Sequence, residues 1–266
     1  MLNHFALYPN RILTNIIHVI KMKKKYYPMV YLITMFMSLP TFVSCDDDND
    51  SGNKASSKHI VKIVEEVEED KVWIYESDIT YDSQGRVVRI VTSNAGTSSK
   101  VSEITYQYGE EHILSKEVEG SWSETHTYTL ENGLIVKDVR NQNGSSKTTT
   151  YEYDNNGYMK SLTDQSLGYT QKFVWKDGNL INIGTRSYTY SNTPWNERMI
   201  FYIKGSNMDE ALWQSGCWGK RPKNLPSRYG DYSYEYTLTG GLVTKVINKW
   251  MDRGIEEKAI STLVWE

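Results

Sequence analysis

Aromatic and basic side chains crowd into one stretch of this 266-residue chain, and these are residue types that could bind a ligand. Tryptophan and tyrosine rings offer flat apolar faces, and a nearby guanidinium offers fixed hydrogen-bond donors, a combination that suits a saccharide or a peptide. The candidate ligand-binding residues are Trp195, Trp213, Trp218, Tyr229 and Arg221. The competing interpretation is structural, because a long irregular loop also needs large side chains to pack it down.

Residues suited to catalysis or to metal binding are few and poorly spaced. His59, His112 and His126 have no neighbour at metal-ligand spacing, and the chain has no phosphate-binding loop, zinc-protease helix motif or serine nucleophile elbow. The acidic run from Glu65 to Asp70 could supply paired carboxylates, but consecutive strand residues point to opposite faces, so we expect a solvated hairpin end there. We therefore expect a protein that is not an enzyme, with no catalytic residue, no metal site and no cofactor.

The N-terminal stretch has the organisation of an export signal. Met22 is followed by three lysines, then by an uncharged, mostly apolar run to Val43, and then by a serine and Cys45. A basic segment, an apolar segment and a small residue before the cut are typical of a signal peptide. We expect residues 22–44 to be that signal and residues 1–21 to be an extension from a misassigned upstream start.

The end of this signal, Phe42-Val43-Ser44-Cys45, resembles the lipobox of bacterial lipoproteins, although an ordinary cleavage site with a chance cysteine is the alternative. The resemblance implies that Cys45 is lipidated and becomes the mature N-terminus. The polar stretch that follows has nothing to bury, which makes residues 45–57 a tether. Its acidic residues Asp46, Asp47 and Asp48 resemble the surface-export signal of Bacteroidota lipoproteins. This implies an outer-membrane, lipid-anchored protein exposed on the cell surface, with the periplasmic face as the alternative.

Charge and cysteine content narrow the class of the mature part. The chain has 30 basic and 33 acidic residues, and five of the basic residues but none of the acidic ones precede Cys45, so the mature net charge is about −8. Such a surface repels phosphate backbones, and nucleic acid is not expected as a partner. Cys217 is the other cysteine, so no intramolecular disulfide is expected once Cys45 is lipidated.

Glycines at a fixed period indicate a repeated unit. Gly85, Gly109, Gly133 and Gly157 are each 24 residues apart, and each follows a tyrosine within a few residues. Asn-Gly and Asp-Gly pairs supply the positive φ angles that tight hairpin turns need. Segments such as residues 102–106 alternate apolar and polar side chains, as half-buried strands do. Each repeat is therefore predicted to be one two-stranded β-hairpin.

Residues 58–266 are accordingly expected to form a single all-β domain. In sequence, the hairpins make an antiparallel meander of about a dozen or more strands, which curls or closes into a barrel-like sheet because closure removes exposed edges. Prolines interrupt the rhythm over residues 191–231, which we expect to be an irregular insertion. A short helix is predicted within it over residues 207–216, with Asn207 as the N-cap and Glu210 as its capping-box partner.

The phrases Tyr81-Asp82-Ser83-Gln84-Gly85 and Tyr153-Asp154-Asn155-Asn156-Gly157 resemble the YD hairpin repeats of RHS-type proteins. Together with the leader, the chain is similar to Bacteroidota lipoprotein families of unknown function that have a porin-like β fold. The similarity spans roughly residues 58–190 and 232–266, and it implies a fold and an address but no activity. Charged and amide side chains recur along the strands, so a membrane-spanning porin is not expected.

An anchor, a tether and an aromatic insertion without catalytic groups favour a surface-tethered binding module for a glycan, a peptide or a partner protein. The alternative is a structural or envelope-interaction protein with no small ligand, and a hydrolase is the third hypothesis. We expect contact with the membrane through the lipid anchor alone, and we expect a monomer.

Overall fold

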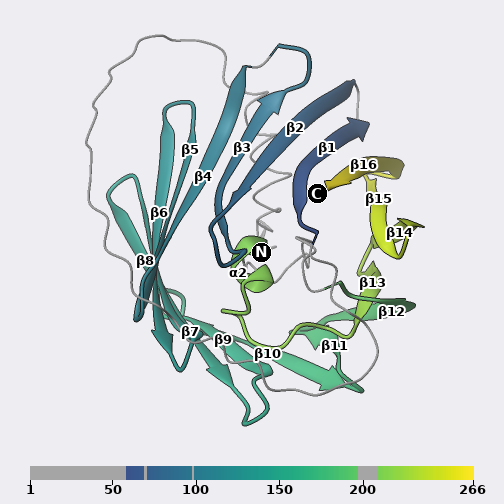
Figure 1. The fold of residues 1–266 in the computed structure, drawn as a ribbon. Helices are drawn as coiled ribbons and strands as arrows, with labels where there is room; N and C mark the ends of the chain where they lie inside the picture. The colour runs from purple at the N-terminus through teal and green to yellow at the C-terminus, as the bar shows by residue number, and fades with distance from the viewer. Residues whose placement is uncertain (1–57, 69–70, 98, 197–208) are drawn as a thin grey trace.

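The computed structural model describes residues 58–68, 71–97, 99–196 and 209–266, whose strands form one closed antiparallel barrel (Figure 1). Each strand pairs with the next one in sequence, and the last strand pairs with the first. The strands are β1 (Ile60–Glu68), β2 (Val72–Tyr81), β3 (Val87–Asn94), β4 (Lys100–Tyr108), β5 (His112–Glu119), β6 (Trp122–Glu131), β7 (Leu134–Gln142), β8 (Ser145–Tyr153), β9 (Met159–Asp164), β10 (Tyr169–Lys176), β11 (Asn179–Ile183), β12 (Arg186–Pro194), β13 (Asn224–Tyr229), β14 (Tyr232–Thr239), β15 (Leu242–Asp252) and β16 (Ile255–Trp265). Cys45 and the acidic residues Asp46, Asp47 and Asp48 lie outside the described residues.

The prediction of an all-β antiparallel meander that closes on itself is confirmed. Figure 1 shows the strands following one another around a ring from blue β1 to yellow β16, which lies beside β1, with the short helix α2 (Glu210–Gln214) inside the ring. The backbones of His59 and Glu266 exchange two hydrogen bonds, of 2.6 and 2.9 Å. The two ends of the domain therefore meet at the seam.

The connections between strands alternate between two ends of the barrel. We call the end with the β2–β3, β4–β5 and later even-to-odd connections the plug end, and the end with the β1–β2, β3–β4 and later odd-to-even hairpins the far end. Because β1 begins and β16 finishes at the plug end, both termini of the domain lie there. The connection between β12 and β13, which contains α2, also begins and finishes at the plug end.

Aromatic residues near the end of even-numbered strands explain why tyrosine belongs to the repeat. The Tyr81 hydroxyl, at the end of β2, donates to the carbonyl of Ile60, at the start of β1. Seven bonds of this kind, 2.6–2.8 Å long, join Tyr81 to Ile60, Tyr108 to Val87, Tyr153 to Ile135, Trp175 to Met159, Tyr190 to Leu180, Tyr236 to Pro226 and Trp265 to Val243. Each bond ties the even strand to its odd predecessor at the plug end.

The aspartate that follows the tyrosine in two repeats builds the next turn. The Asp82 side chain accepts hydrogen bonds of 2.9 Å from the backbone amides of Gln84 and Arg86, and Asp154 does the same two and four residues onward. Such Asx turns replace a backbone turn with a side-chain one. A second kind of turn joins β6 to β7, where Asn132 and Gly133 have φ angles of 52° and 78°, as a two-residue hairpin requires.

Strand register separates an inner face of the wall from an outer one. Directly paired residues share a face, and the inward rows contain most of the buried apolar side chains, such as Ile79, Ile113, Tyr128 and Ile135. The outward rows contain charged pairs, for example Lys62 with Glu76 across β1 and β2. The core of the protein is therefore the interior of the barrel itself.

The predicted insertion at residues 191–231 is too wide. β12 continues to Pro194, and β13 forms over Asn224–Tyr229, which leaves residues 195–223 as the connection. Pro226 is accommodated within β13 because this strand pairs with β14 at Arg228 and Tyr229, beyond the proline. A proline lacks the N–H that a ladder needs, so it suits a stretch of strand that is unpaired on one side.

The helix forms within the predicted range, but its predicted N-cap was wrong. Asp209 is the N-cap, because its side chain accepts from the backbone amides of Ala211 at 3.0 Å and Leu212 at 3.4 Å. Asn207 lies outside the described residues. Gly216, with a φ of 82°, follows the last turn as expected. In the described part of the chain, no helix has the length and hydropathy needed to cross a membrane.

Candidate functional site inside and at the far end of the barrel

The aromatic residues proposed as a ligand surface lie in the core. Trp195, Trp213, Trp218 and Tyr229 are 8%, 3%, 1% and 1% exposed, so none presents a ring face to solvent. Arg221 is half-buried. The three tryptophans thus belong to the packed core around the insertion, as the structural interpretation of this stretch expects, whereas Tyr229 belongs to β13 and stacks on Tyr188 at 4.4 Å.

Residues 209–223, which we call the plug, cross the interior at the plug end. The plug meets the backbone at four points around the barrel: the Gln214 side chain donates to Gly85 O, Cys217 O accepts from Ile135 N, Lys220 N donates to Gly157 O, and Lys223 N donates to Gly178 O. These bonds run from the β2–β3 connection to the β10–β11 connection. The plug therefore spans this end from one wall to another.

Trp218 is the centre of the plug. Its ring packs edge-on against Tyr128 at 5.8 Å and against Tyr151 at 4.7 Å, and its indole N–H donates to Asp209 O at 3.1 Å. The next residue, Gly219, has a φ of 77°, and a Cβ there would overlap the carbonyl oxygen of Gly157. Only glycine allows the plug to approach the wall this closely.

A quartet of charged residues lies on the inner face of β6 and β7, above the plug. His126 contacts the Asp138 carboxylate through Nδ1 at 2.9 Å and the Glu124 carboxylate through Nε2 at 2.7 Å, and Arg140 also pairs with Glu124. The histidine ring stacks on Tyr128 at 5.4 Å, and Tyr128 in turn contacts Trp218 of the plug. A general base needs a free ring nitrogen, and in this quartet both nitrogens contact carboxylates.

More carboxyl groups are buried where the plug meets the barrel. Both oxygens of Asp209 accept from the Tyr106 hydroxyl, at 2.9 and 2.8 Å, and burial raises the pKa of Asp209 above its ordinary value although Tyr106 and His126 oppose the shift. Burial, followed by the charge of Asp209, raises the pKa of Glu210 to about 8. On β1, burial raises the pKa of Glu65 to about 7. Together with the charged quartet, these groups make part of the barrel interior polar, next to the apolar core.

This polar interior is not predicted from the sequence. The sequence predicts no ligand neighbour for His126 and a solvated hairpin end at Glu65, whereas the structure pairs His126 with two carboxylates and turns Glu65 inward. The available signal was the alternation Glu124, His126, Tyr128, which puts all three on one face of a strand. That signal says that the three share a face, but only the register with β7 brings Asp138 and Arg140 to them.

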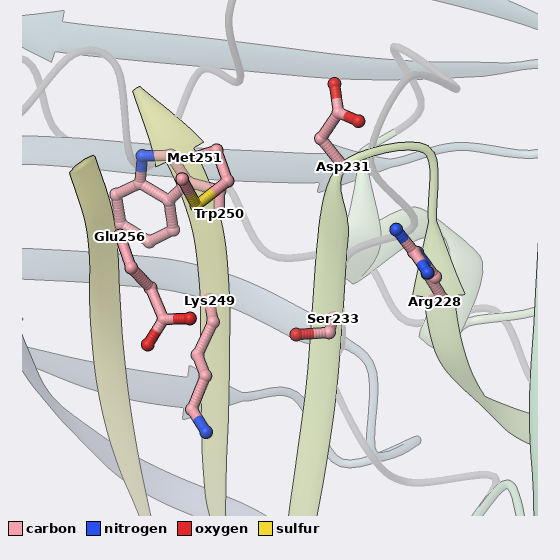
Figure 2. A pocket seen from close by; sticks show the side chains of 7 residues that line it. All are labelled: Arg228, Asp231, Ser233, Lys249, Trp250, Met251 and Glu256. Atoms are coloured by element: carbon pink, nitrogen blue, oxygen red, sulfur yellow. The ribbon is translucent and has the colours of Figure 1, made fainter. Parts of the chain in front are cut away.

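A pocket of about 270 Å³ lies at the far end, between the tips of two hairpins (Figure 2). We call it the rim pocket. It is lined by Arg228, Asp231, Ser233, Lys249, Trp250, Met251 and Glu256. In Figure 2 Ser233 on β14 points toward Lys249 on the neighbouring β15, and Lys249 and Glu256 extend in the same direction. Lys249 also pairs with Glu235 at 2.6 Å. The pocket thus combines charges of both signs with an indole and a thioether.

Within the residues that the structure describes, no group of three or more His, Cys, Asp or Glu side chains is arranged to hold a metal ion. The Cys217 sulfur accepts a hydrogen bond from Ser215 at 3.2 Å, and burial raises the pKa of its thiol.

Comparisons with solved structures return porin-like proteins of the genus Bacteroides. The crystal structure of a porin-like protein from Bacteroides uniformis ATCC 8492 has a TM-score of 0.58 and 16% identity, covering 78% of this chain and 98% of that one. A porin-like protein from Bacteroides vulgatus ATCC 8482 has a TM-score of 0.50 and 10% identity, covering 79% and 99%. At such identities the likeness concerns the fold alone. No curated protein sequence matches the chain.

A protein-family model matches residues 79–239, from β2 through the plug to β14. The match includes the tyrosine-and-glycine repeats, the charged quartet and the plug, and it covers more than half of the chain. The chain belongs to the family described as a domain of unknown function (DUF4595) with porin-like fold.

Proposed function

We propose that this protein is a lipid-anchored, non-catalytic binding module of the cell envelope that captures a small polar ligand at the far end of its barrel. The observation that carries the proposal is the rim pocket, which lies at the opposite end from the plug and the termini. Concave sites with an apolar floor and a few charged groups are the usual places where proteins bind small molecules.

The lining of the rim pocket favours a saccharide or the end of a peptide. Trp250 and Met251 supply apolar surface, Ser233 supplies a hydroxyl, and Arg228 and Asp231 supply charges of opposite sign. Hydroxylated or zwitterionic ligands use both donors and acceptors of this kind. The charged quartet, whose histidine nitrogens both contact carboxylates, supports a binding role over a hydrolytic one.

The position of the termini supports presentation of the far end away from a membrane. The domain begins at the plug end, next to His59, so the tether expected at residues 45–57 would attach there. A flexible tether of this length has an end-to-end distance of roughly 20 Å. Anchoring through Cys45 would hold the plug end toward the membrane and leave the rim pocket toward the surroundings.

The outer wall supports a barrel that stands in water on its anchor. Arg89 pairs with Glu103 at 2.6 Å, Lys62 with Glu76 at 3.0 Å, and both pairs lie on outward rows. A lipid-facing charge costs about 2–4 kcal/mol at the bilayer midplane, whereas the same side chains are fully solvated in water.

Ligand capture is tested by glycan and peptide arrays probed with the purified mature chain. Arg228→Ala should weaken any specific hit by about tenfold, the value of one charge-assisted hydrogen bond. Arg253→Ala is the matched control, because Arg253 lies at the tip of the β15–β16 hairpin outside the pocket lining. Equal loss in both variants, or arrays without a specific hit, would leave a structural envelope role as the better explanation.

Anchoring is tested separately in cells. Cys45→Ala should abolish incorporation of labelled palmitate and release the protein into soluble fractions. Replacing Asp46, Asp47 and Asp48 with alanine should keep the lipid but lower protease accessibility on whole cells. Retention of Cys45→Ala protein in the membrane would contradict the anchor.

A further inference from the structure

The interior of the barrel, with the start of the plug, carries more carboxylates than cations. Register and the plug together place these acidic side chains toward the interior: Glu65, Glu117, Glu119, Glu124, Asp138, Glu257, Asp209 and Glu210. The inward cations of the same rows are His126, Arg140, Lys147 and Arg186. His126 and Arg140 pair with carboxylates inside the quartet. On the wall formed by β1, β15 and β16, inward hydrogen-bond acceptors therefore outnumber inward donors.

Glu65 is the clearest case of an inward-facing, partly buried carboxylate without a compensating charge. It faces inward from β1 and is paired with Tyr75 on β2 and Ser261 on β16. The Ser261 hydroxyl donates to it over a long 3.4 Å, and within the described residues Glu65 takes part in no ion pair. Burial raises its pKa to about 7, and the Ser261 bond only partly opposes this shift.

The plug adds to the same negative potential. The carboxyl of Glu210 is buried, and this burial is the largest cause of its raised pKa. The charges of Asp209, Glu117 and Glu65 raise the pKa further, and a hydrogen bond from the Glu210 backbone amide partly opposes the shift. The carboxyl groups on β1, β5 and α2 therefore interact electrostatically inside the barrel. Buried charges in proteins are normally paired, because an unpaired one is costly to desolvate.

Asn248 provides an independent sign that a donor is missing. This residue is 9% exposed, faces inward from β15, and its Oδ1 atom is buried without a hydrogen-bond partner. Asn248 pairs with Ala259, which is two residues from Ser261 on the same face of β16. Asn248 and Glu65 thus look into the interior from the two sides of one strand, and an unmade buried hydrogen bond costs about 1–3 kcal/mol.

We propose that this part of the interior, bounded by Glu65, Asn248 and Glu210, binds a primary ammonium group. An ammonium is compact and carries three donors with one positive charge. It would donate to Asn248 Oδ1 and to the Glu65 carboxylate, and its charge would balance those of Glu65 and Glu210. The site is separate from the rim pocket, whose Lys249 lies on the outward row next to the inward-facing Asn248.

Calorimetric titration of the mature chain with 1,4-diaminobutane tests the proposal, with 1,4-butanediol as the uncharged control of the same length. The diamine should bind and the diol should not. Binding requires ionised Glu65, so near pH 7 it should release protons, and the measured heat should change with the ionisation enthalpy of the buffer. A lysine with blocked backbone termini is the second arm: binding of it as well indicates a peptide side chain as the source, and binding of the diamine alone indicates a free amine.

Matched variants locate the site. Glu65→Gln and Asn248→Leu should each lower the affinity for the diamine by about tenfold or more, the value of a hydrogen bond to a charged group. Glu66→Gln is the control, because Glu66 is the next residue on β1 and faces outward beside Ile74. Melting temperatures verify that each variant is folded. Equal binding of diamine and diol, no binding of either, or an equal effect of Glu66→Gln would overturn the proposal.

Discussion

At the plug end, seven aromatic donors tie strand pairs together and the plug bonds to the wall at four points, whereas at the far end the same strands enclose carboxylates, a histidine and an arginine. The wall is continuous, so the difference comes from which inward positions carry apolar and which carry polar side chains. Tyr128 lies at the boundary between the two halves, because its ring contacts Trp218 of the plug and His126 of the charged quartet. Aromatic packing and cross-strand hydrogen bonds are concentrated in one half of the interior, and inward charged side chains in the other.

This contrast suggests a division of labour along the barrel axis. Residues of the plug are mostly buried and bond to the wall, although the buried Trp213 Nε1 and Gln214 Oε1 atoms have no hydrogen-bond partner. Residues such as Glu65 and Asn248 keep a cost that a better-paired core would remove. Proteins keep such costs mainly at functional sites, so substitutions in the two halves should differ in their effect on stability.

The largest effect is expected from Gly219→Ala. The new Cβ would overlap the Gly157 carbonyl and would sit on a residue with a φ of 77°. Strain and overpacking together should cost about 3 kcal/mol or more, measured by the urea midpoint of unfolding. Gly144→Ala is the matched control at the far end, since its φ is 76° and nothing lies within 4 Å of its Cβ. It should cost only about 1 kcal/mol, and equal losses would show that the plug is not tightly held.

A second effect concerns pH and the polar half. The folded pKa of Glu65 is raised to about 7 from an ordinary 4.5, so the folded state binds more protons than the unfolded state between these values. The stability associated with protonated Glu65 is therefore complete below pH 4.5 and is lost as pH rises through about 7, by up to about 1.4 kcal/mol per pH unit. Urea midpoints measured from pH 5 to 9 should fall less steeply in Glu65→Gln than in Glu66→Gln. Identical slopes would contradict the burial of Glu65.

A smaller effect is expected at a single aromatic donor. Tyr190→Phe removes the bond to the Leu180 carbonyl between β11 and β12, which pair at only two positions of their ladder. The loss should be about 1 kcal/mol, visible as a lower melting temperature. Tyr169, which is 55% exposed on β10, supplies the comparison: Tyr169→Phe should leave the melting temperature unchanged. A similar drop in melting temperature in both variants would show that the aromatic hydrogen bonds do not stabilise the plug end.

The smallest effect is expected on the outer wall, which belongs to neither half of the interior. Arg89→Ala breaks the pair with Glu103, but Arg89 is half exposed and Lys100 also contacts Glu103 at 2.6 Å. Exposed pairs contribute about 0–1 kcal/mol, so the urea midpoint should barely move. A loss as large as that of Gly219→Ala would mean that the outer wall, and not the interior, sets the stability.

Local features were predictable from the sequence, and features that depend on register were not. The Asn132-Gly133 turn follows from backbone chemistry alone, and it forms as expected. The role of Tyr81 could not be derived in this way, because its partner Ile60 is 21 residues away on another strand. The N-cap shows the limit within one turn: Asn207 and Asp209 are both suitable cap residues, and the tertiary bond from Tyr106 favours Asp209.

The candidate sites were harder to predict than the fold for the same reason. Composition alone cannot tell an exposed aromatic cluster from a buried one, and Trp213 and Trp218 proved to be buried. The polar interior needs strands from both halves of the chain, since Glu65 on β1 meets Ser261 on β16. The rim pocket likewise joins two hairpins, so neither hairpin's sequence shows it.

The seam between β1 and β16 has a kinetic consequence. Residues 60 and 265 pair directly, so the barrel cannot close until the last strand has been delivered. Contacts between distant residues form slowly because the chain must first lose loop entropy. During that delay the edge of β1 stays unpaired, and the charges of Lys62, Glu66 and Glu68 along it discourage pairing with another molecule. Closure of the barrel is therefore the final step of folding, and the charged first strand waits for its partner until then.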